Sequence, residues 1–466
     1  MKRMQTPVRT AISVAIGAML ANNIVNAGAF SLYTEGSTTA VGNYAAGIAA
    51  EVADASTGWY NPAGLVFLGK QQALLSGVGV FPSTKLSGSS TFTTIGLPSY
   101  TQPFSNLQAS KDAFVPAFHY ALPLADRAAF GLSIVSPFGL STEYSNSSQV
   151  RYAATFTELL SVTVSPELAG KLTDNLAIGA GLDLQWAQVK FNRMLGAPTL
   201  LQVFGAPPTM WDSSSYNKGH SFGVGFHAGV LAMFNDQHTR VGLNYQSRMN
   251  HTFDGYSVLT GPLADVPLFQ DAAATFRTDN LYSNDIQFPE IVTLSAYQDV
   301  NERLAVLGSI VYTGWNVFKT IQLNNVAAAT PLVGPVVVTS TSAQNYRDAW
   351  RFAVGANYRV NEQWMLRVGG GYDQTPTVDA ERDMRLPDAD RWALSIGAHY
   401  QMRPALGFDV GYTHLFASGD TTVNKTEPLG TTSAYNVTAS GKPHADLVGI
   451  QAVWTIDKEQ APIPTK

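Results

Sequence analysis

Residues 176–190, with the sequence LAIGAGLDLQWAQVK, decide the fold because their apolar side chains recur at every second position. In an extended strand, Leu182 and Leu184 point to one face, whereas Asp183 and Gln185 point to the other. A strand with one apolar and one polar or small face is typical of a sheet that separates two different environments.

Fourteen segments of this kind are predicted in the chain, and short and long connections alternate between them. Bacterial outer-membrane barrels have short periplasmic turns and long external loops, and a membrane-crossing strand needs about 9–11 residues. A soluble two-sheet sandwich is the alternative, but its strands are usually shorter. The sequence therefore predicts an all-β fold, a 14-stranded antiparallel transmembrane β-barrel. The predicted strands are residues 71–81, 113–122, 127–136, 159–170, 174–191, 220–235, 239–251, 288–299, 302–313, 347–360, 363–374, 391–402, 405–416 and 445–456.

The N-terminal residues 1–27 have the features of a secretory signal peptide. Lys2 and Arg9 precede a short apolar run, and Ala27 ends a cleavage site of small residues. The apolar run is too short to cross a bilayer as a helix. A buried N-terminal helix is the alternative interpretation.

The rest of the chain divides at Gln71, where the period-two pattern begins. Residues 28–70 are rich in Gly, Ala, Ser and Thr and predict a hatch, or plug, inside the lumen, with a short helix over 45–55. Residues 71–456 are the predicted barrel, and residues 457–466 are a polar C-terminal tail.

The composition excludes several classes of function. The chain has no cysteine, which excludes a thiol enzyme, a disulfide scaffold and a zinc–cysteine site. Its formal net charge is −5 without a basic stripe, so nucleic acid is not an expected partner. The eight histidines show no metal-ligand spacing, and no phosphate loop or nucleophile–base arrangement is evident. We therefore expect no metal, no cofactor and no enzymatic activity.

Several short motifs occur in an order and spacing that resemble one known family. These motifs are Gly28-Ala29-Phe30, Asn61-Pro62-Ala63, SPFGLSTEY at 136–144, Phe288-Pro289-Glu290, Tyr312-Thr313-Gly314-Trp315 and PDADR at 387–391. Over nearly all of the mature chain, the sequence resembles the long-chain fatty-acid outer-membrane transporter (FadL) family, which includes aromatic-hydrocarbon transporters.

The resemblance implies a function and a route for the ligand. The chain is expected to be a passive channel of the Gram-negative outer membrane for uptake of long-chain fatty acids or similar hydrophobic compounds. In the family, the ligand binds in a groove between external loops, moves to a deeper pocket and leaves sideways through a kink in strand three. Aromatic hydrocarbons or alkanes are the alternative cargo, and an outer-membrane lipid hydrolase or an open porin are less favoured alternatives. Outer-membrane lipid, lipopolysaccharide and the barrel-assembly machinery are the other expected partners.

The resemblance also assigns residues to the binding of ligand. Ser136 and Arg193 match the family's head-group contacts, and Lys319 lies near the position of its lysine, which aligns with Gln322 here. Exposed apolar clusters mark binding surfaces, although the two apolar loops 192–219 and 252–287 can also simply pack on each other as a lid. The predicted apolar ligand contacts in these loops are Leu200, Leu201, Phe204, Leu268 and Phe269.

A lateral gate is expected where proline interrupts strand three. Pro137 cannot donate to a sheet ladder, so it either opens a gap or simply ends the strand. The predicted hatch and gate residues are Phe30, Asn61, Pro62, Ala63, Pro137 and Phe138. A set of inward arginines is expected to fix the hatch, or alternatively to line a polar path. These residues are Arg240, Arg248, Arg351, Arg359, Arg367 and Arg391.

Overall fold

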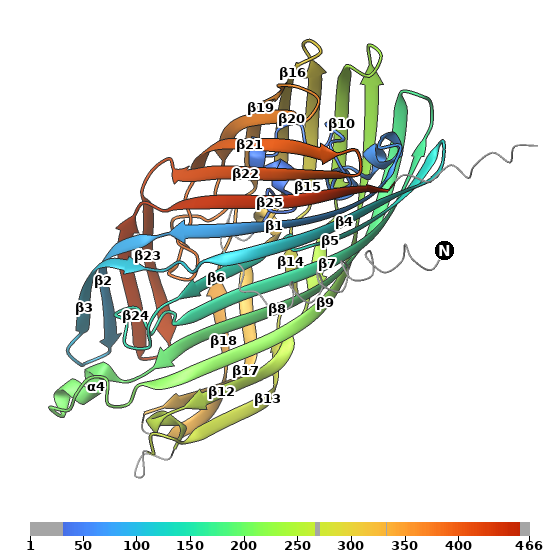
Figure 1. Cartoon of the computed structure of the whole chain (residues 1–466). Coiled ribbons are helices and arrows are strands. Elements are labelled where there is room, and N and C mark those ends of the chain that lie inside the picture. The colour runs from blue at the N-terminus through green and yellow to red at the C-terminus, as the bar shows by residue number, and fades with distance from the viewer. Residues whose placement is uncertain (1–30, 266–270, 332, 457–466) are drawn as a thin grey trace, which may run out of the picture.

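The computed structural model describes residues 31–265, 271–331 and 333–456 (Figure 1). The predicted signal peptide and C-terminal tail, and the predicted site residues Phe30, Leu268 and Phe269, lie outside these ranges. Within the described ranges, no helix is long and apolar enough to cross a membrane.

The fold is a closed antiparallel barrel of 14 strands, as the sequence predicts. Closure is complete because β1 pairs with β4 on one side and with the last strand, β25, on the other. A closed barrel leaves no sheet edge unpaired in lipid, where each unsatisfied backbone group is costly. In order around the barrel, the strands are β1 Gln71–Ser83, β4 Ala113–Ala125, β5 Ala128–Val135 with β6 Gly139–Glu143, β7 Phe156–Lys171, β8 Leu176–Leu195, β9 Ser213–Phe234, β10 Thr239–Gln246 with β11 Met249–His251 and β12 Asp254–Thr260, β13 Thr275–Ser283 with β14 Ile286–Phe288 and β15 Ile291–Asp299, β16 Leu304–Thr313, β19 Ala349–Arg359, β20 Trp364–Asp373, β21 Arg391–Arg403, β22 Leu406–Ala417 and β25 His444–Ile456.

The predicted alternation of side chains is confirmed on the barrel wall. Val354 is 69% exposed on the outer surface, whereas Arg351, three residues earlier on the same strand, points inward and is buried. Aromatic pairs lie near both ends of the apolar band, with ring centroids 4.5 Å apart for Trp364 and Tyr400 and 4.8 Å apart for Tyr372 and Trp392. Such pairs match the aromatic girdles that flank the lipid-facing band of outer-membrane barrels.

Several segments that the sequence assigned to long loops form strands outside the membrane. A four-stranded sheet and a second group of hairpins extend from the end of the barrel that carries the long connections (Figure 1). Strands β8 and β9 also stay paired as far as Leu195 and Ser213, so the wall projects beyond the strands predicted there. The strands and helices of these extensions are β2 Lys85–Thr94, β3 Tyr100–Gln108, β23 Thr421–Leu429 and β24 Ser433–Gly441 in the sheet, with β17 Thr320–Thr330, β18 Gly334–Ala343, α4 Pro198–Val203, η2 Pro262–Ala264 and η3 Trp315–Val317.

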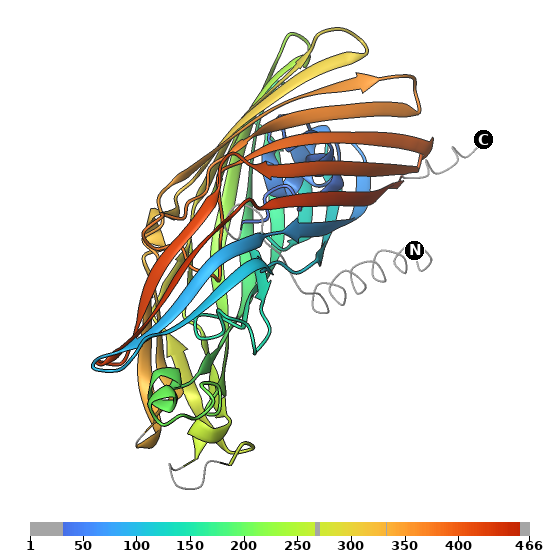
Figure 2. The ribbon, with the colours of Figure 1, turned by 90° about the vertical axis from the view of Figure 1, so that its left-hand side faces the viewer.

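Residues 31–70, here called the hatch segment, lie inside the barrel (Figures 1 and 2). The segment contains α2 (Thr38–Asn43), α3 (Thr57–Tyr60) and the short 3-10 helix η1 (Pro62–Phe67). The helix expected over 45–55 is wrong. Tyr44 and Ala45 have φ angles of 58° and 57°, and this left-handed backbone ends the helix that begins at Thr38.

Inward side chains of the wall hydrogen-bond to the backbone of the hatch segment. The Ser309 hydroxyl accepts from Gly47 N at 2.8 Å, and Thr413 donates to the Val41 carbonyl at 2.7 Å. The wall is also shaped to receive this backbone. A Cβ added at Gly242 would lie 1.9 Å from the carbonyl oxygen of Ala49, so only glycine fits there.

The role expected for the inward arginines is confirmed for two of them. Arg240 donates to the Glu51 carbonyl at 2.6 Å, and Arg351 donates to the Tyr44 carbonyl at 3.2 Å. Arg367 and Arg391 pair with carboxylates outside the hatch segment, since Arg367 contacts Asp409 at 2.7 Å and Arg391 contacts Asp388 at 2.6 Å. The expectation is wrong for Arg248, which is exposed and forms an ion pair with Glu290, and Arg359 is also exposed.

Candidate ligand-binding site

The third barrel strand is interrupted at Ser136, Pro137 and Phe138, between β5 and β6. Before the interruption Val135 pairs with Thr163 of β7, and after it Gly139 pairs with Leu160. Three residues of strand three therefore face two of β7, which is a β-bulge.

The interruption is larger on the side of strand two. Pairing between β4 and β5 ends at Phe118 and Ile134, and it returns only as an isolated bridge between Ser110 and Thr142. Residues 135–141 therefore have no ladder partner on β4. We call this stretch the wall break.

The hatch segment and one serine supply hydrogen bonds at the wall break. The Ser161 hydroxyl accepts from Phe138 N at 3.0 Å and donates to the Phe138 carbonyl at 2.6 Å. Leu32 N donates to the Pro137 carbonyl at 2.8 Å, and Ser31 forms a β-bridge with Phe138. The beginning of the hatch segment thus lies beside the break as an extra short strand.

The turn Asn61-Pro62-Ala63 was expected near this place, but the structure puts it elsewhere. Asn61 donates to the Val230 carbonyl at 3.0 Å, and a Cβ on Gly179 would lie 2.5 Å from Ala63 N. Gly179 pairs with Ala169 of β7, which in turn pairs with Ala129 near the beginning of strand three. Ala129 is seven residues before Ser136. At about 3.3 Å per residue, the turn is about 23 Å from the wall break.

An apolar cavity of about 50 Å³ lies inside the barrel, between the wall break and the extracellular end. Its lining is mostly aromatic and aliphatic, and it includes three residues with charged side chains. The lining residues are Leu140, Thr157, Glu158, Leu159, Val189, Phe191, Phe253, Ile286, Phe288, Phe318, Ile321, Gln344, Tyr346, Asp383, Arg385 and Leu386.

A cluster of aromatic rings connects this cavity to the wall break. The ring of Phe138 lies 4.7 Å from that of Phe288 and 6.1 Å from that of Trp315, measured between centroids. Phe318 and Tyr346 continue the cluster, with centroids 4.8 Å apart. Phe138 therefore belongs both to the interrupted strand and to the apolar cluster that the cavity adjoins.

The residues predicted to bind the ligand head group do not form one site. Arg193 lies beyond Phe191 on β8 and contacts Glu427 at 3.5 Å. Ser136 is buried. By strand register, it lies about seven residues, or about 23 Å, nearer the periplasmic end than Arg193. A single carboxylate cannot contact both. Lys319 is exposed and is not among the cavity-lining residues.

The apolar loop residues are divided between local packing and exposure. On α4, Leu201 is buried, Leu200 is half-buried, and Phe204 just after the helix is 69% exposed. In the other loop, Leu259 and Leu263 are buried in a small core with residues of β17. Leu195 and Trp211 of the first loop pack against the same core, so the two loops do pack on each other, while Phe204 of the first loop remains exposed.

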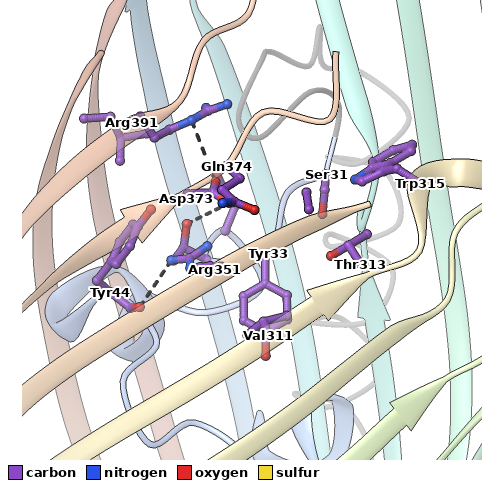
Figure 3. Close-up of a pocket in the computed structure, with 14 residues that line it drawn as sticks. Ser31, Tyr33, Tyr44, Val311, Thr313, Trp315, Arg351, Asp373, Gln374 and Arg391 are labelled. Carbon is purple, nitrogen blue, oxygen red and sulfur yellow. Dashed lines mark hydrogen bonds and ion pairs between the residues drawn. The ribbon is translucent and has the colours of Figure 1, made fainter. Parts of the chain in front are cut away.

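A second pocket, of about 30 Å³, lies between the hatch segment and the wall (Figure 3). It is polar, and Arg351 stacks over the Tyr44 ring at 3.7 Å from its centroid. Glu35 also lines it and is completely buried, and this burial raises the pKa of its carboxyl above the ordinary value. Trp315 lines this pocket and also belongs to the aromatic cluster, so one ring separates the polar pocket from the apolar region.

These features define a class of protein: an outer-membrane barrel that contains its own N-terminal segment and an apolar cavity beside a break in its wall. The family model described as outer membrane protein transport protein (OMPP1/FadL/TodX) matches residues 18–455. The chain belongs to this family, and it is located in the outer membrane of a Gram-negative cell.

Individual relatives agree with this assignment. The chain is 27% identical to a long-chain fatty acid transport protein of Escherichia coli O6:H1 over 93% of its length and 96% of the relative. It is 28% identical to outer membrane protein P1 of Haemophilus influenzae, covering 94% of this chain and 97% of that protein. The crystal structure of a Pseudomonas aeruginosa FadL homologue has the same fold, with a TM-score of 0.75 at 24% identity over 91% of this chain and 99% of that chain.

Proposed function

We propose that this protein is a passive channel through which long-chain fatty acids, or hydrophobic compounds like them, enter the cell. The observation that carries the proposal is the position of Phe138, which is part of the wall break and also of the aromatic cluster beside the apolar cavity. The name of the Escherichia coli relative, a long-chain fatty acid transport protein, supports the choice of cargo.

The proposed route has three steps. Ligand first meets exposed apolar side chains near α4, such as Phe204, and then enters the apolar cavity. From there it passes Phe138 and leaves sideways through the wall break into the membrane. Transfer of a hydrocarbon into lipid is favourable by about 0.8 kcal/mol per methylene, whereas release into the periplasm would expose the same surface to water.

The hatch segment closes the straight path in this proposal. Its backbone is held by side chains from several barrel strands, including Ser309 and Thr413. The mature chain then begins near residue 28, after removal of residues 1–27, and the hatch is a fixed part of the barrel rather than a separate domain.

An aromatic hydrocarbon is the second candidate cargo. The cavity is lined by the rings of Phe191, Phe253, Phe288, Phe318 and Tyr346, which pack favourably against another ring. The structure of the Ralstonia pickettii toluene transporter TbuX also has this fold, with a TM-score of 0.58 at 20% identity.

A reversible cross-link across the wall break tests the lateral route. Beyond the last paired residues, the register places Pro116 of strand two opposite Ser136 of strand three. In the double variant Pro116→Cys/Ser136→Cys, a disulfide should stop the uptake of a fluorescent fatty acid, while binding to the purified protein persists. The native chain has no cysteine, so the bond forms only where it is designed.

The matched control is Tyr120→Cys/Leu132→Cys, which joins the same two strands where they are already paired. Its oxidised and reduced forms should transport equally fast, and the reduced form of the first pair should transport as the native protein does. Equal uptake by the oxidised and reduced forms of the Pro116/Ser136 pair would exclude lateral exit.

A further inference from the structure

Arg385 is the cation that lines the apolar cavity without a carboxylate partner. Its guanidinium donates to the Thr157 hydroxyl at 3.1 Å and to the Ala153 carbonyl at 2.5 Å, and it lies 5.8 Å from the centre of the Phe191 ring. Among the described residues, no carboxylate oxygen lies within ion-pair distance of it. Its short-range partners are therefore two neutral acceptors and a ring, none of which carries a negative charge.

The other charged groups around this end of the cavity are already paired. Glu158, which lines the cavity, contacts Lys190 at 2.8 Å, and Glu427 contacts Arg193 at 3.5 Å. Glu381 forms an ion pair with Lys425. Arg385 is therefore the cation at this end of the cavity that has no ion-pair partner among the described residues.

Asp383 is an acidic residue of the same cavity that forms no ion pair with the guanidinium. One oxygen accepts from the backbone N of Arg385 at 2.8 Å, and the other, Oδ2, is buried without a hydrogen-bond partner. Burial raises the pKa of the Asp383 carboxyl above its ordinary value, and the nearby charge of Arg385 partly opposes this rise. Both residues line the same cavity.

We propose that Arg385 is the head-group subsite of the apolar cavity and binds a single carboxylate, while the hydrocarbon chain of that ligand points inward to Phe288 and Phe138. The planar guanidinium matches a carboxylate with two parallel hydrogen bonds. This inference rests on the proposed function, and it assigns the cation to a residue that the family motifs did not indicate.

The strand register sets the direction of the ligand. Arg385 is hydrogen-bonded to Thr157 of β7, whereas Phe138 is hydrogen-bonded to Ser161. Ser161 is four residues nearer the periplasmic end of the same strand. The two ends of the subsite are therefore about 13 Å apart along the strand at about 3.3 Å per residue. An extended hydrocarbon chain covers this distance, whereas a single aromatic ring does not.

Binding requires movement of side chains, because the cavity of about 50 Å³ is smaller than the several hundred Å³ of a usual ligand pocket. Phe191 and Ile321 border the buried cluster and are only partly buried, so they have room to move. Binding of the carboxylate to Arg385 fixes the head group of the ligand. The hydrocarbon chain of the ligand then displaces side chains of the apolar cluster towards the wall break.

The test compares two ligands that differ only in the head group, oleate and oleyl alcohol, in binding to the purified full-length protein. Arg385→Gln should weaken oleate binding at least tenfold, equivalent to about 1.4 kcal/mol, and leave oleyl alcohol within twofold. Lys442→Gln removes one exposed positive charge from a residue that does not line the cavity and should change neither affinity. Arg385→Lys keeps the charge and should restore most of the preference for oleate.

Each other outcome has a distinct meaning. An equal loss for both ligands, no loss for either, or a loss of oleate binding in Lys442→Gln as large as in Arg385→Gln would overturn the role of Arg385. If the native protein binds neither ligand, the proposed function itself fails. Heat-dependent mobility of the barrel on gels verifies that each variant is folded before binding is compared.

The direction of the chain is tested by fluorescence quenching. Oleate analogues with bromine at the methyl end should quench Trp315, which packs against Phe138, more strongly than analogues brominated next to the carboxylate. Subtraction of the signal of Trp315→Phe isolates this residue from the other tryptophans. Stronger quenching by the carboxylate-end analogue would reverse the orientation and overturn this part of the proposal.

Discussion

Ser161 is expected to be the main stabilising contact of the wall break, and the structure gives the size of its effect. Its completely buried hydroxyl forms two hydrogen bonds to Phe138, one to the backbone N and one to the carbonyl. Each lost hydrogen bond to a buried backbone group costs about 1–3 kcal/mol. Ser161→Ala should therefore lower the free energy of unfolding by roughly 2–6 kcal/mol.

The measurement is urea-induced unfolding in lipid vesicles, followed by tryptophan fluorescence. Ser141→Ala is the matched control, because Ser141 is also buried in strand three but its hydroxyl has no hydrogen-bond partner among the described residues. It should change stability by less than about 0.5 kcal/mol. Ser161→Thr keeps the hydroxyl and should recover much of the loss. If Ser161→Ala and Ser141→Ala have equal effects, the hydroxyl of Ser161 does not hold the break.

Two further predictions concern the two faces of the wall. Gly242→Ala puts a methyl group against the Ala49 carbonyl and should displace the hatch segment, so that ion conductance in planar bilayers rises. Gly308→Ala is the control, because the nearest atom to the added methyl group would be 3.6 Å away, and conductance should stay low. Unchanged conductance in Gly242→Ala would contradict the close contact. Val354→Arg puts a charge in the middle of a lipid-facing strand and should cost about 2–4 kcal/mol in vesicle unfolding. Val360→Arg, just beyond the periplasmic end of that strand, should cost less than about 1 kcal/mol, and equal losses would argue against this placement in the membrane.

The barrel itself could be predicted because its signal is local. Side chains such as Leu182 and Asp183 alternate within one strand, and the apolar set must face lipid whatever the rest of the chain does. The same argument placed Val354 outward and Arg351 inward, as the structure shows.

The external strands could not be predicted because both of their faces are polar or mixed. β2, with the sequence KLSGSSTFTT, pairs with β3 and also with β24, which lies about 350 residues later in the chain. A strand without an apolar face has little periodic signal, and its partner cannot be read from its own residues. The segment therefore resembled a loop.

The residues proposed for the ligand route were only partly predictable for a similar reason. Pro137 could be singled out because proline has a local effect on a strand, and strand pairing is interrupted at this residue. Arg385 lies in a long connection with no periodic pattern, two residues before the motif at 387–391 that supported the family resemblance. That proximity was the available signal, but only the folded chain brings Arg385 to Thr157 and Phe191.

The long sequence separation between the hatch segment and its partners has a consequence for the order of folding. Thr38 N donates to the side chain of Gln451, which lies 413 residues later on the strand that closes the barrel. The Val41 carbonyl is bonded to Thr413, also near the end of the chain. Contacts of such high sequence separation form late, because the entropy of closing the loop must be overcome first. The segment that precedes the whole barrel in the chain therefore reaches its final place only when the last strands arrive, and barrel closure and lumen filling become a single event in assembly.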